Sequence, residues 1–227
     1  MPLPNNIQEN NNIFSLSIPI RIEYDECLKK IHPTRRPPDE NLLKTIVHKS
    51  NELVQPQSVF RLACIESVEH DGVVIDKTRF SGPLLPQTLP KTSAVFPFII
   101  TLGQKLDDKI FSSDNLMEQF YFDQIGNILL KKCGTYLESH IKKSYAVKQL
   151  SSISPGSLTT WPIEEQKPLF SLFGNTQSLI GVSLTPQMLM IPSKSISGFF
   201  FPTQEKFIAC SFCSRKKCPE RSAPYKY

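Results

Sequence analysis

The chain has 227 residues, of which 40% are hydrophobic and 21% are charged. This composition is typical of a folded globular protein and argues against a chain that is mostly disordered. The net charge is +5, but the basic residues are scattered apart from Lys29 to Arg36 and Arg215 to Lys217. A protein that binds nucleic acid usually gathers its basic residues in a patch or stripe, so we expect no nucleic-acid partner.

The N-terminal residues and the length of the apolar runs indicate the cellular compartment of the protein. Residues 1–12 are rich in asparagine and lack a basic lead-in followed by an apolar core, so they predict a mobile arm and not a signal peptide. The longest apolar run, residues 94–102, contains Pro97 and is far shorter than the roughly 20 residues that cross a bilayer. We therefore expect a cytoplasmic protein with no membrane partner. In that reducing compartment, its six cysteines are expected as thiols or metal ligands and not as disulfides.

The first predicted elements are a strand and two helices. Apolar residues at every second position over residues 13–24 predict a strand, which Pro19 confines to an edge or a bulge. A short helix is expected at residues 25–31. Prolines and acidic residues at positions 37–40 predict the start of a second helix, whose apolar stripe continues to Val54.

The middle of the chain predicts strands. Alternation over residues 59–69, followed by Asp71-Gly72 and three apolar residues at positions 73–75, indicates a hairpin. Residues 94–101 are apolar on both faces, as expected for a central strand that is covered on both sides.

A long helix and a punctuated C-terminal third complete the pattern. Asn115 followed by Glu118 is typical of a helix start, and apolar residues at helical spacing then extend to Ile141. After the Gly- and Pro-containing stretch, we expect a short helix at residues 163–173 and strands at residues 188–191 and 196–201. The sum is an α+β fold with one mixed or antiparallel sheet flanked by helices.

Common catalytic motifs are absent from the sequence. The nine glycines are isolated, which excludes the usual phosphate loops and the dinucleotide-binding fingerprint. The four histidines lack metalloprotease spacing, and there is no Gly-x-Ser-x-Gly elbow. Asp123-Gln124-Ile125-Gly126 falls inside the long predicted helix, where we expect a polar face and a close helix contact at Gly126 and not a catalytic group.

A series of short motifs in fixed order fills residues 154–201. They are Ser154-Pro155-Gly156, Trp161-Pro162-Ile163-Glu164-Glu165-Gln166, Leu169-Phe170, Gly181-Val182-Ser183-Leu184-Thr185, and a Met-x-Pro-x-x-Ser-x-Ser-Gly run from Met190 to Gly198. Their order and spacing resemble the reactivation (S-adenosylmethionine-binding) domain of cobalamin-dependent methionine synthase. Thr101-Leu102-Gly103 and the Asp123 to Gly126 element are similar to the stand-alone members of that family.

This resemblance implies a fold and a role. It implies an α+β domain with a twisted sheet over residues 13–209, between the mobile arm (1–12) and a cysteine-rich basic tail (210–227). It implies an accessory protein, a component rather than a complete enzyme, that supports reductive methylation of a partner's cob(II)alamin with S-adenosylmethionine. The chain lacks the Asp-x-His-x-x-Gly signature of cobalamin-binding domains. Cobalamin would therefore be held by a corrinoid methyltransferase or another cobalamin-binding protein, with a flavodoxin- or ferredoxin-type reductant.

The resemblance also implies the residues near S-adenosylmethionine, which are Ser152, Ser154, Pro155, Gly156, Ser157, Ser195 and Ser197. Ser152 and Ser157 stand where the family has an Arg and a Tyr, so the usual carboxylate anchor and aromatic wall are missing. The family's acidic residue on the preceding helix falls near Lys131 or Lys132, whose charge would repel the sulfonium.

Alternatives stay open for these positions. Backbone N–H groups around Pro155-Gly156-Ser157 could hold the ligand carboxylate, or the segment could be only a tight turn. Ser195 and Ser197 could face a cleft or could be ordinary strand residues. Loss of the side-chain anchors also leaves open a ligand-free docking module of the same fold.

Three cysteines lie close together in the tail. Cys210, Cys213 and Cys218 are separated by three and five positions, next to several basic residues. Thiolates at such spacing predict a zinc site that clamps the tail or an iron–sulfur cluster that transfers electrons, although a fourth ligand is not evident and metal-free thiols remain an alternative. Cys64 and Cys133 occupy apolar faces, so we expect buried structural thiols there.

Overall fold

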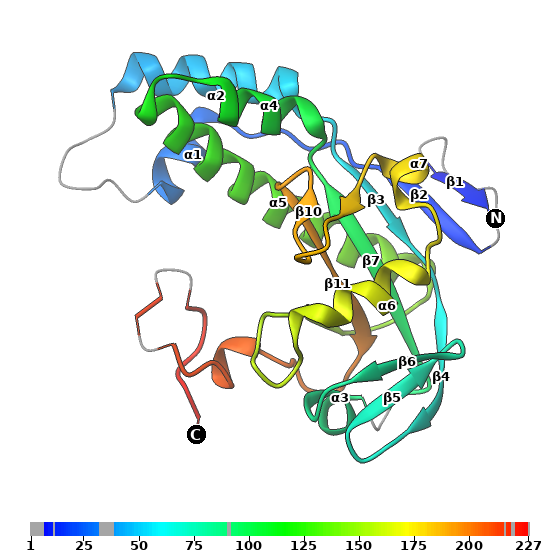
Figure 1. The fold of residues 1–227 in the computed structure, drawn as a ribbon. Helices are drawn as coiled ribbons and strands as arrows, with labels where there is room; N and C mark the ends of the chain where they lie inside the picture. The colour runs from blue at the N-terminus through cyan, green and yellow to red at the C-terminus, as the bar shows by residue number, and fades with distance from the viewer. Residues whose placement is uncertain are drawn as a thin grey trace. The chain divides into compact units, whose positions relative to one another are not determined.

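The computed structural model describes residues 7–10, 12–31, 39–89, 92–215, 217–218 and 221–226. The chain divides into two compact units. Unit 1 comprises Met1–Val59, Ile99–Leu137 and Asn175–Ile196, and unit 2 comprises Phe60–Phe98, Glu138–Gly174 and Ser197–Tyr227. Figure 1 colours the elements in chain order.

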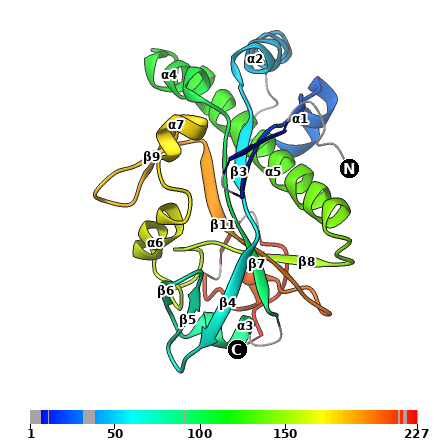
Figure 2. The same cartoon turned by 90° about the vertical axis from the view of Figure 1, so that its right-hand side faces the viewer.

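Unit 1 holds most of the helical residues. Its helices are α1 (Tyr24–Lys30), α2 (Glu40–Leu53), α4 (Gln104–Ser112), the first 22 residues of α5 (Leu116–Ser144, divided after Leu137) and α7 (Thr176–Ile180). Helix α2 begins where Asp39 accepts hydrogen bonds from the N–H groups of Asn41 and Leu42, both at 3.0 Å. Figures 1 and 2 show α2 and α4 side by side.

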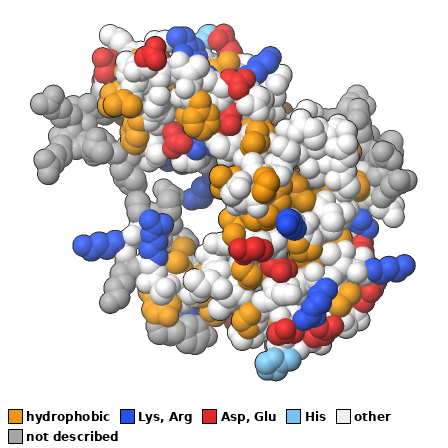
Figure 3. Space-filling model, in the orientation of Figure 1, with side chains coloured by type: hydrophobic (Ala, Val, Ile, Leu, Met, Phe, Trp, Pro, Cys, Tyr) orange, Lys and Arg blue, Asp and Glu red, His pale blue; other side chains and the backbone are white. Residues whose placement is uncertain are grey.

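The surface of the unit 1 helices is mixed in charge. Figure 3 shows acidic and basic side chains interspersed there, with a few hydrophobic side chains between them.

Helix α5 starts at an Asn115 cap, whose Oδ1 accepts from the N–H groups of Met117 at 2.9 Å and Glu118 at 3.3 Å. Among the described residues, no helix combines the length and the apolarity that a membrane span requires.

The strands of unit 1 are β1 (Ile7–Asn10), β2 (Ile13–Ser17), β3 (Gln57–Phe60) and the end of β7 (Ala94–Thr101), hydrogen-bonded in the order β1-β2-β3-β7. Strands β9 (Ser183–Leu184) and β10 (Met190–Ile191) form a separate antiparallel pair. The predicted N-terminal arm thus contains a strand, because β1 pairs with β2. The strand predicted over residues 13–24 ends at Ser17, two residues before Pro19.

Unit 2 is built on an antiparallel sheet. Its strands are the start of β7, β4 (Ala63–Val68), β5 (Gly72–Ile75), β6 (Thr78–Ser81), β8 (Leu150–Ile153) and most of β11 (Ser195–Pro202). The order is β7-β4-β5-β6, with β11 paired to β7 and β8. The β4–β5, β4–β7, β5–β6 and β8–β11 pairings are all antiparallel.

Short helices and aromatic side chains complete unit 2. The helices are α3 (Leu84–Thr88), η1 (Ile163–Glu165), α6 (Gln166–Ser171), η2 (Ala209–Ser211) and the last turns of α5. Phe199 is fully buried and lies 5.0 Å from Phe80 and 5.2 Å from Trp161, measured between ring centroids. The predicted α+β fold, with an antiparallel sheet flanked by helices, is therefore confirmed.

Candidate functional site

The Pro-Gly turn (residues 154–157) lies in unit 2, directly after strand β8. Its N–H groups are used inside the loop. The N–H of Gly156 donates to the carbonyl of Trp161 at 2.8 Å, and the N–H of Ser157 donates to the carbonyl of Ser154 at 3.1 Å. Pro155 has no N–H. None of these three residues therefore presents a free N–H to an anion, so the prediction that they hold a ligand carboxylate is not supported by this geometry.

Gly156 is required by the shape of this loop. Its φ angle is +77°, in the left-handed region that side chains disfavour. A Cβ at this position would also lie 3.0 Å from Cβ of Ile163. The Pro-Gly turn is therefore closed by its own backbone bonds, and Ile163 at the start of η1 leaves no room for a side chain at position 156.

The two serines that replace the family's Arg and Tyr behave differently. Ser152 lies in β8 opposite Phe200 of β11, and its side chain is exposed. The hydroxyl of Ser157 donates to the carbonyl of Ser154 at 2.6 Å, so it reinforces the turn. Of the two, Ser152 is the side chain that remains open to a ligand.

Strand β11 brings Ser197 close to this loop. Ser197 is buried, and the next residue, Gly198, packs directly against the end of β8. A Cβ on Gly198 would lie 2.3 Å from the carbonyl oxygen of Ile153 and 2.8 Å from Oγ of Ser154. The structure therefore places Ser152, Ser154, Pro155, Gly156, Ser157 and Ser197 in one region of unit 2.

Ser195 belongs to unit 1 and forms part of a second region. It is buried, and its hydroxyl lies 2.7 Å from the carbonyl of Pro192 and 2.9 Å from Oγ1 of Thr101. These bonds connect the start of β11 with the end of β7. Of the two alternatives for Ser195, they favour an ordinary structural residue.

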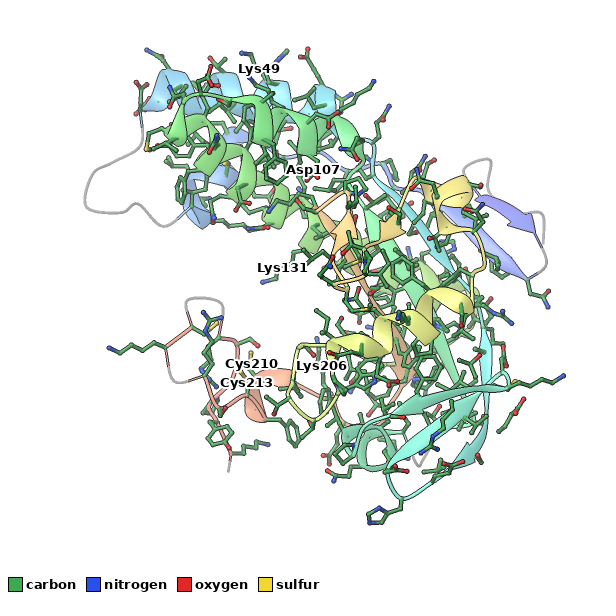
Figure 4. All side chains as sticks on the ribbon, viewed as in Figure 1. Lys49, Asp107, Lys131, Lys206, Cys210 and Cys213 are labelled. Carbon is green, nitrogen blue, oxygen red and sulfur yellow. The ribbon has the colours of Figure 1, made fainter. Side chains whose placement is uncertain are left out.

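The two residues before Ser195 are held by carboxylates. Asp107 of α4, labelled in Figure 4, is buried and accepts from the N–H of Ser193 at 3.0 Å and from its hydroxyl at 2.5 Å. Nζ of Lys194 donates to Oδ1 of Asp123 at 2.6 Å and to Oδ1 of Asn127 at 2.8 Å, both on α5. The Ser193–Ser195 segment (residues 193–195) is thus tied to α4, α5 and β7.

This region explains the Asp123 to Gly126 element. A Cβ on Gly126 would lie 3.1 Å from Cδ of Lys194, so the glycine makes room for the lysine side chain beside α5. The same Cβ would lie 3.3 Å from Cδ2 of Leu106 on α4, so the close helix contact expected at Gly126 is confirmed. Asp107 and Asn127 were not among the predicted site residues. Asp123 and Asn127 are four positions apart and therefore lie on the same face of α5, with Gly126 between them. This spacing was the feature of the sequence that could have indicated a basic partner such as Lys194.

The two lysines considered on α5 differ in their contacts. Nζ of Lys132 donates to Oε2 of Glu26 and to the carbonyl of Arg21, both at 2.6 Å. Lys131, labelled in Figure 4, is exposed. Lys132 is therefore committed to a contact within unit 1.

The cysteines divide into buried and accessible thiols. Burial raises the pKa of the Cys27 thiol to about 11 and that of Cys133 to about 12. The prediction of a buried thiol is confirmed for Cys133 and wrong for Cys64, whose side chain is exposed because it points away from the covered face of β4.

The tail cysteines, Cys210, Cys213 and Cys218, are partly exposed and unpaired by disulfides. Hydrogen bonding from Ser222 lowers the pKa of the Cys210 thiol, and the Arg221 guanidinium acts in the same direction. Within the described residues, which omit 216, 219, 220 and 227 of this tail, no three His, Cys, Asp or Glu side chains are arranged to hold a metal ion. The described part of the tail thus does not assemble the predicted three-cysteine metal site.

Two cavities have the size of small-molecule sites. One, of about 700 Å³ in unit 1, is lined by Ser17, Ile18, Pro19, Gln55, Pro56, Gln57, Gly103, Gln104, Gln177, Ile180 and Gly181. The other, of about 500 Å³ in unit 2, is lined by Gln87, Thr88, Thr92, Val147, Lys148, Gln149, Pro202, Thr203, Gln204 and Glu205. Neither cavity is lined by the residues that the resemblance implied.

Comparison with known proteins supports the fold. No protein-family model matches the sequence, and no curated protein matches it. Among solved structures, the chain is similar to the MetH reactivation domain bound to AdoHcy, with a TM-score of 0.62 and 14% sequence identity. The match covers 90% of this chain and 83% of that domain. The reactivation-domain fold is therefore shared over most of both chains.

Proposed function

We propose that this protein is an accessory factor of cobalamin-dependent methyl transfer that binds an S-adenosyl ligand and supports reductive methylation of a partner's cobalamin. The observation that carries the proposal is the fold shared with an AdoHcy-bound reactivation domain over 90% of the chain. The motif order over residues 154–201 supports it from the sequence. On this proposal the protein acts as a stand-alone relative of that domain.

The groups around the Pro-Gly turn favour a particular way of holding the ligand. The N–H groups of Gly156 and Ser157 are already bonded inside the loop. The exposed hydroxyl of Ser152 can donate or accept. Carbonyl and hydroxyl acceptors suit the amino groups of an S-adenosyl ligand better than its carboxylate. We therefore expect weaker anchoring of the carboxylate than an arginine at position 152 would provide.

Calorimetry tests ligand binding. The purified full-length protein is titrated with S-adenosylhomocysteine and with S-adenosylmethionine, and the same titrations are made on Ser152→Arg. We expect measurable heat with the natural sequence and a lower Kd in the variant, because a guanidinium grips a carboxylate in a bidentate manner. Ser178→Arg adds the same charge to an exposed position on α7 in unit 1 and should leave the affinity unchanged.

A ligand-free docking module of the same fold is the second candidate. The internally bonded N–H groups of the Pro-Gly turn favour it, together with Ser152 in place of an arginine. The absence of heat in both the natural protein and Ser152→Arg would reject the S-adenosyl proposal and leave this candidate. Formation of methylcobalamin on a corrinoid methyltransferase can be monitored by visible absorption with and without the protein. Formation that depends on the protein would reject the docking module.

A further inference from the structure

Arg221 folds the cysteine-rich tail onto itself. Its Nη1 donates to the carbonyl of Cys210 at 2.9 Å and to that of Ala223 at 3.2 Å. Its Nη2 donates to the carbonyl of Cys213 at 2.9 Å and also to that of Arg215. One guanidinium thus satisfies four backbone acceptors. It fixes the backbone on both sides of the Cys210 to Cys213 turn.

The backbone between the first two cysteines forms a tight turn. Cys210 lies in η2, and the N–H of Cys213 donates to the carbonyl of Cys210 at 3.4 Å. Turns closed by such a bond keep their end Cα atoms within about 7 Å. Disulfides join Cα atoms that are about 4.4–6.8 Å apart. The turn therefore holds these two cysteines close to the separation that a disulfide requires.

The surroundings distinguish this pair from the other thiols. Cys27 and Cys133 are fully buried, whereas Cys210 and Cys213, labelled in Figure 4, are partly exposed on one short segment. The N–H of Ser222 lies 3.5 Å from Sγ of Cys210 and points a donor at this sulfur. The described residues provide no three-ligand metal site that would occupy the thiols. The turn from Cys210 to Cys213 therefore combines two accessible thiols, a short separation between them and a hydrogen-bond donor at the sulfur of Cys210.

We propose that Cys210 and Cys213 form a redox-active dithiol that exchanges with small-molecule disulfides such as oxidised glutathione. Cys210 attacks one sulfur of the disulfide, forms a mixed disulfide and releases the first substrate thiol, which takes the proton that Cys210 gives up. Cys213 then attacks the sulfur of Cys210, closes the intramolecular disulfide and releases the second substrate thiol with its own proton. Two electrons pass from the cysteine pair to the substrate disulfide.

Redox titration of the full-length protein tests this site. The protein is equilibrated in buffers of reduced and oxidised glutathione, alkylated, digested and mapped by mass spectrometry. We expect Cys210 and Cys213 to lose alkylation together as the buffer becomes more oxidising, with a peptide cross-link between them. Cys213→Ser should accumulate a glutathione adduct on Cys210 that is not resolved. Cys64→Ser and Cys218→Ser should leave the cross-link in place.

Several outcomes would overturn the proposal. A cross-link that joins Cys218 to either partner would assign the exchange to another pair. Failure of any intramolecular bridge to form across the whole range of buffers would remove the activity. Stoichiometric zinc or iron in the purified protein, lost in Cys210→Ser, would assign the thiols to a metal site. These results do not depend on S-adenosyl binding, so they can be distinguished from failure of the proposed function.

Discussion

Two segments that carry the resemblance are stabilised in opposite ways. The Pro-Gly turn of unit 2 closes through backbone bonds within residues 154–161. The Ser193–Ser195 segment of unit 1 depends on side chains from elsewhere, since Asp107 holds Ser193 and Asp123 holds Lys194. A motif read from sequence can therefore mark a self-contained turn in one place and a set of long-range contacts in another.

This difference has a consequence for mutation. A segment closed by its own backbone should tolerate most side-chain changes but should be sensitive at its glycines. A segment held by distant carboxylates should be sensitive at positions that lie outside it.

The largest effect is expected where the Pro-Gly region packs against β11. In Gly198→Ala the new Cβ would lie 2.3 Å from the carbonyl oxygen of Ile153, a backbone atom that cannot move aside alone. We expect a loss of about 3 kcal/mol in the free energy of unfolding, measured by urea denaturation. Gly134→Ala is the control, because its Cβ meets nothing within 4 Å in α5. There the better helix former should increase stability by up to about 1 kcal/mol.

A somewhat smaller loss is expected from Asp107→Ala. The variant removes a buried carboxylate that accepts from both the N–H and the hydroxyl of Ser193. We expect a cost of about 2 kcal/mol, because hydrogen bonds to charged groups contribute about 1.5–3 kcal/mol. Asp108→Ala on the same helix removes an exposed bond from Gln104 and should cost less than about 0.5 kcal/mol. Equal costs for the two variants would contradict the importance of the long-range contact.

Asp123→Ala should cost less than the Asp107 variant. The bond from Lys194 is short, but the side chain of Asp123 is 42% exposed, so solvent screens the pair. We expect about 1 kcal/mol, decreasing as salt is added. Denaturation at low and high ionic strength measures it, and a double-mutant cycle with Lys194→Met isolates the pairwise energy. A cost that does not change with salt would show that packing around Gly126 dominates.

The smallest effect concerns Glu165, the last residue of η1. Its carboxylate accepts from the N–H of Ser81 at 2.8 Å. Burial raises the pKa of this carboxyl above its usual 4.5. The folded protein therefore binds this proton more tightly than the unfolded chain, and stability decreases as pH rises through the interval between the two pKa values. Glu165→Gln should reduce that dependence and be no less stable at pH 7, as thermal denaturation against pH can measure. A steeper dependence in the variant would refute the assignment.

The sequence predicted elements whose signals are local. Strand β7 was expected because its residues are apolar on both faces, and helix α5 was expected because Asn115 is a typical helix cap. Both signals lie in consecutive residues of the chain. Helices α4 and α7 and strand β8 were not predicted. The two helices are short, and β8 has only four residues. Their formation depends on packing against the rest of their units more than on local propensity.

The candidate site shows the same limit. The glycine at position 156 and the serine at position 152 were identified from their positions in and beside the Pro-Gly motif. The partner of Ser193 lies 86 positions away in the chain, on a helix that the sequence did not reveal. The bonds that occupy the N–H groups of the Pro-Gly turn also could not be foreseen, because the carbonyl that accepts from Gly156 belongs to Trp161, which starts the next motif along the chain.

Trp161 gives the protein a built-in optical reporter. It is the only tryptophan in the chain, it is fully buried, and it lies against Phe199 while its carbonyl closes the Pro-Gly turn. Its indole N–H has no hydrogen-bond partner among the described residues. Its fluorescence therefore comes from one known position beside the candidate site, and occupancy or opening of that loop can be followed without attaching a label.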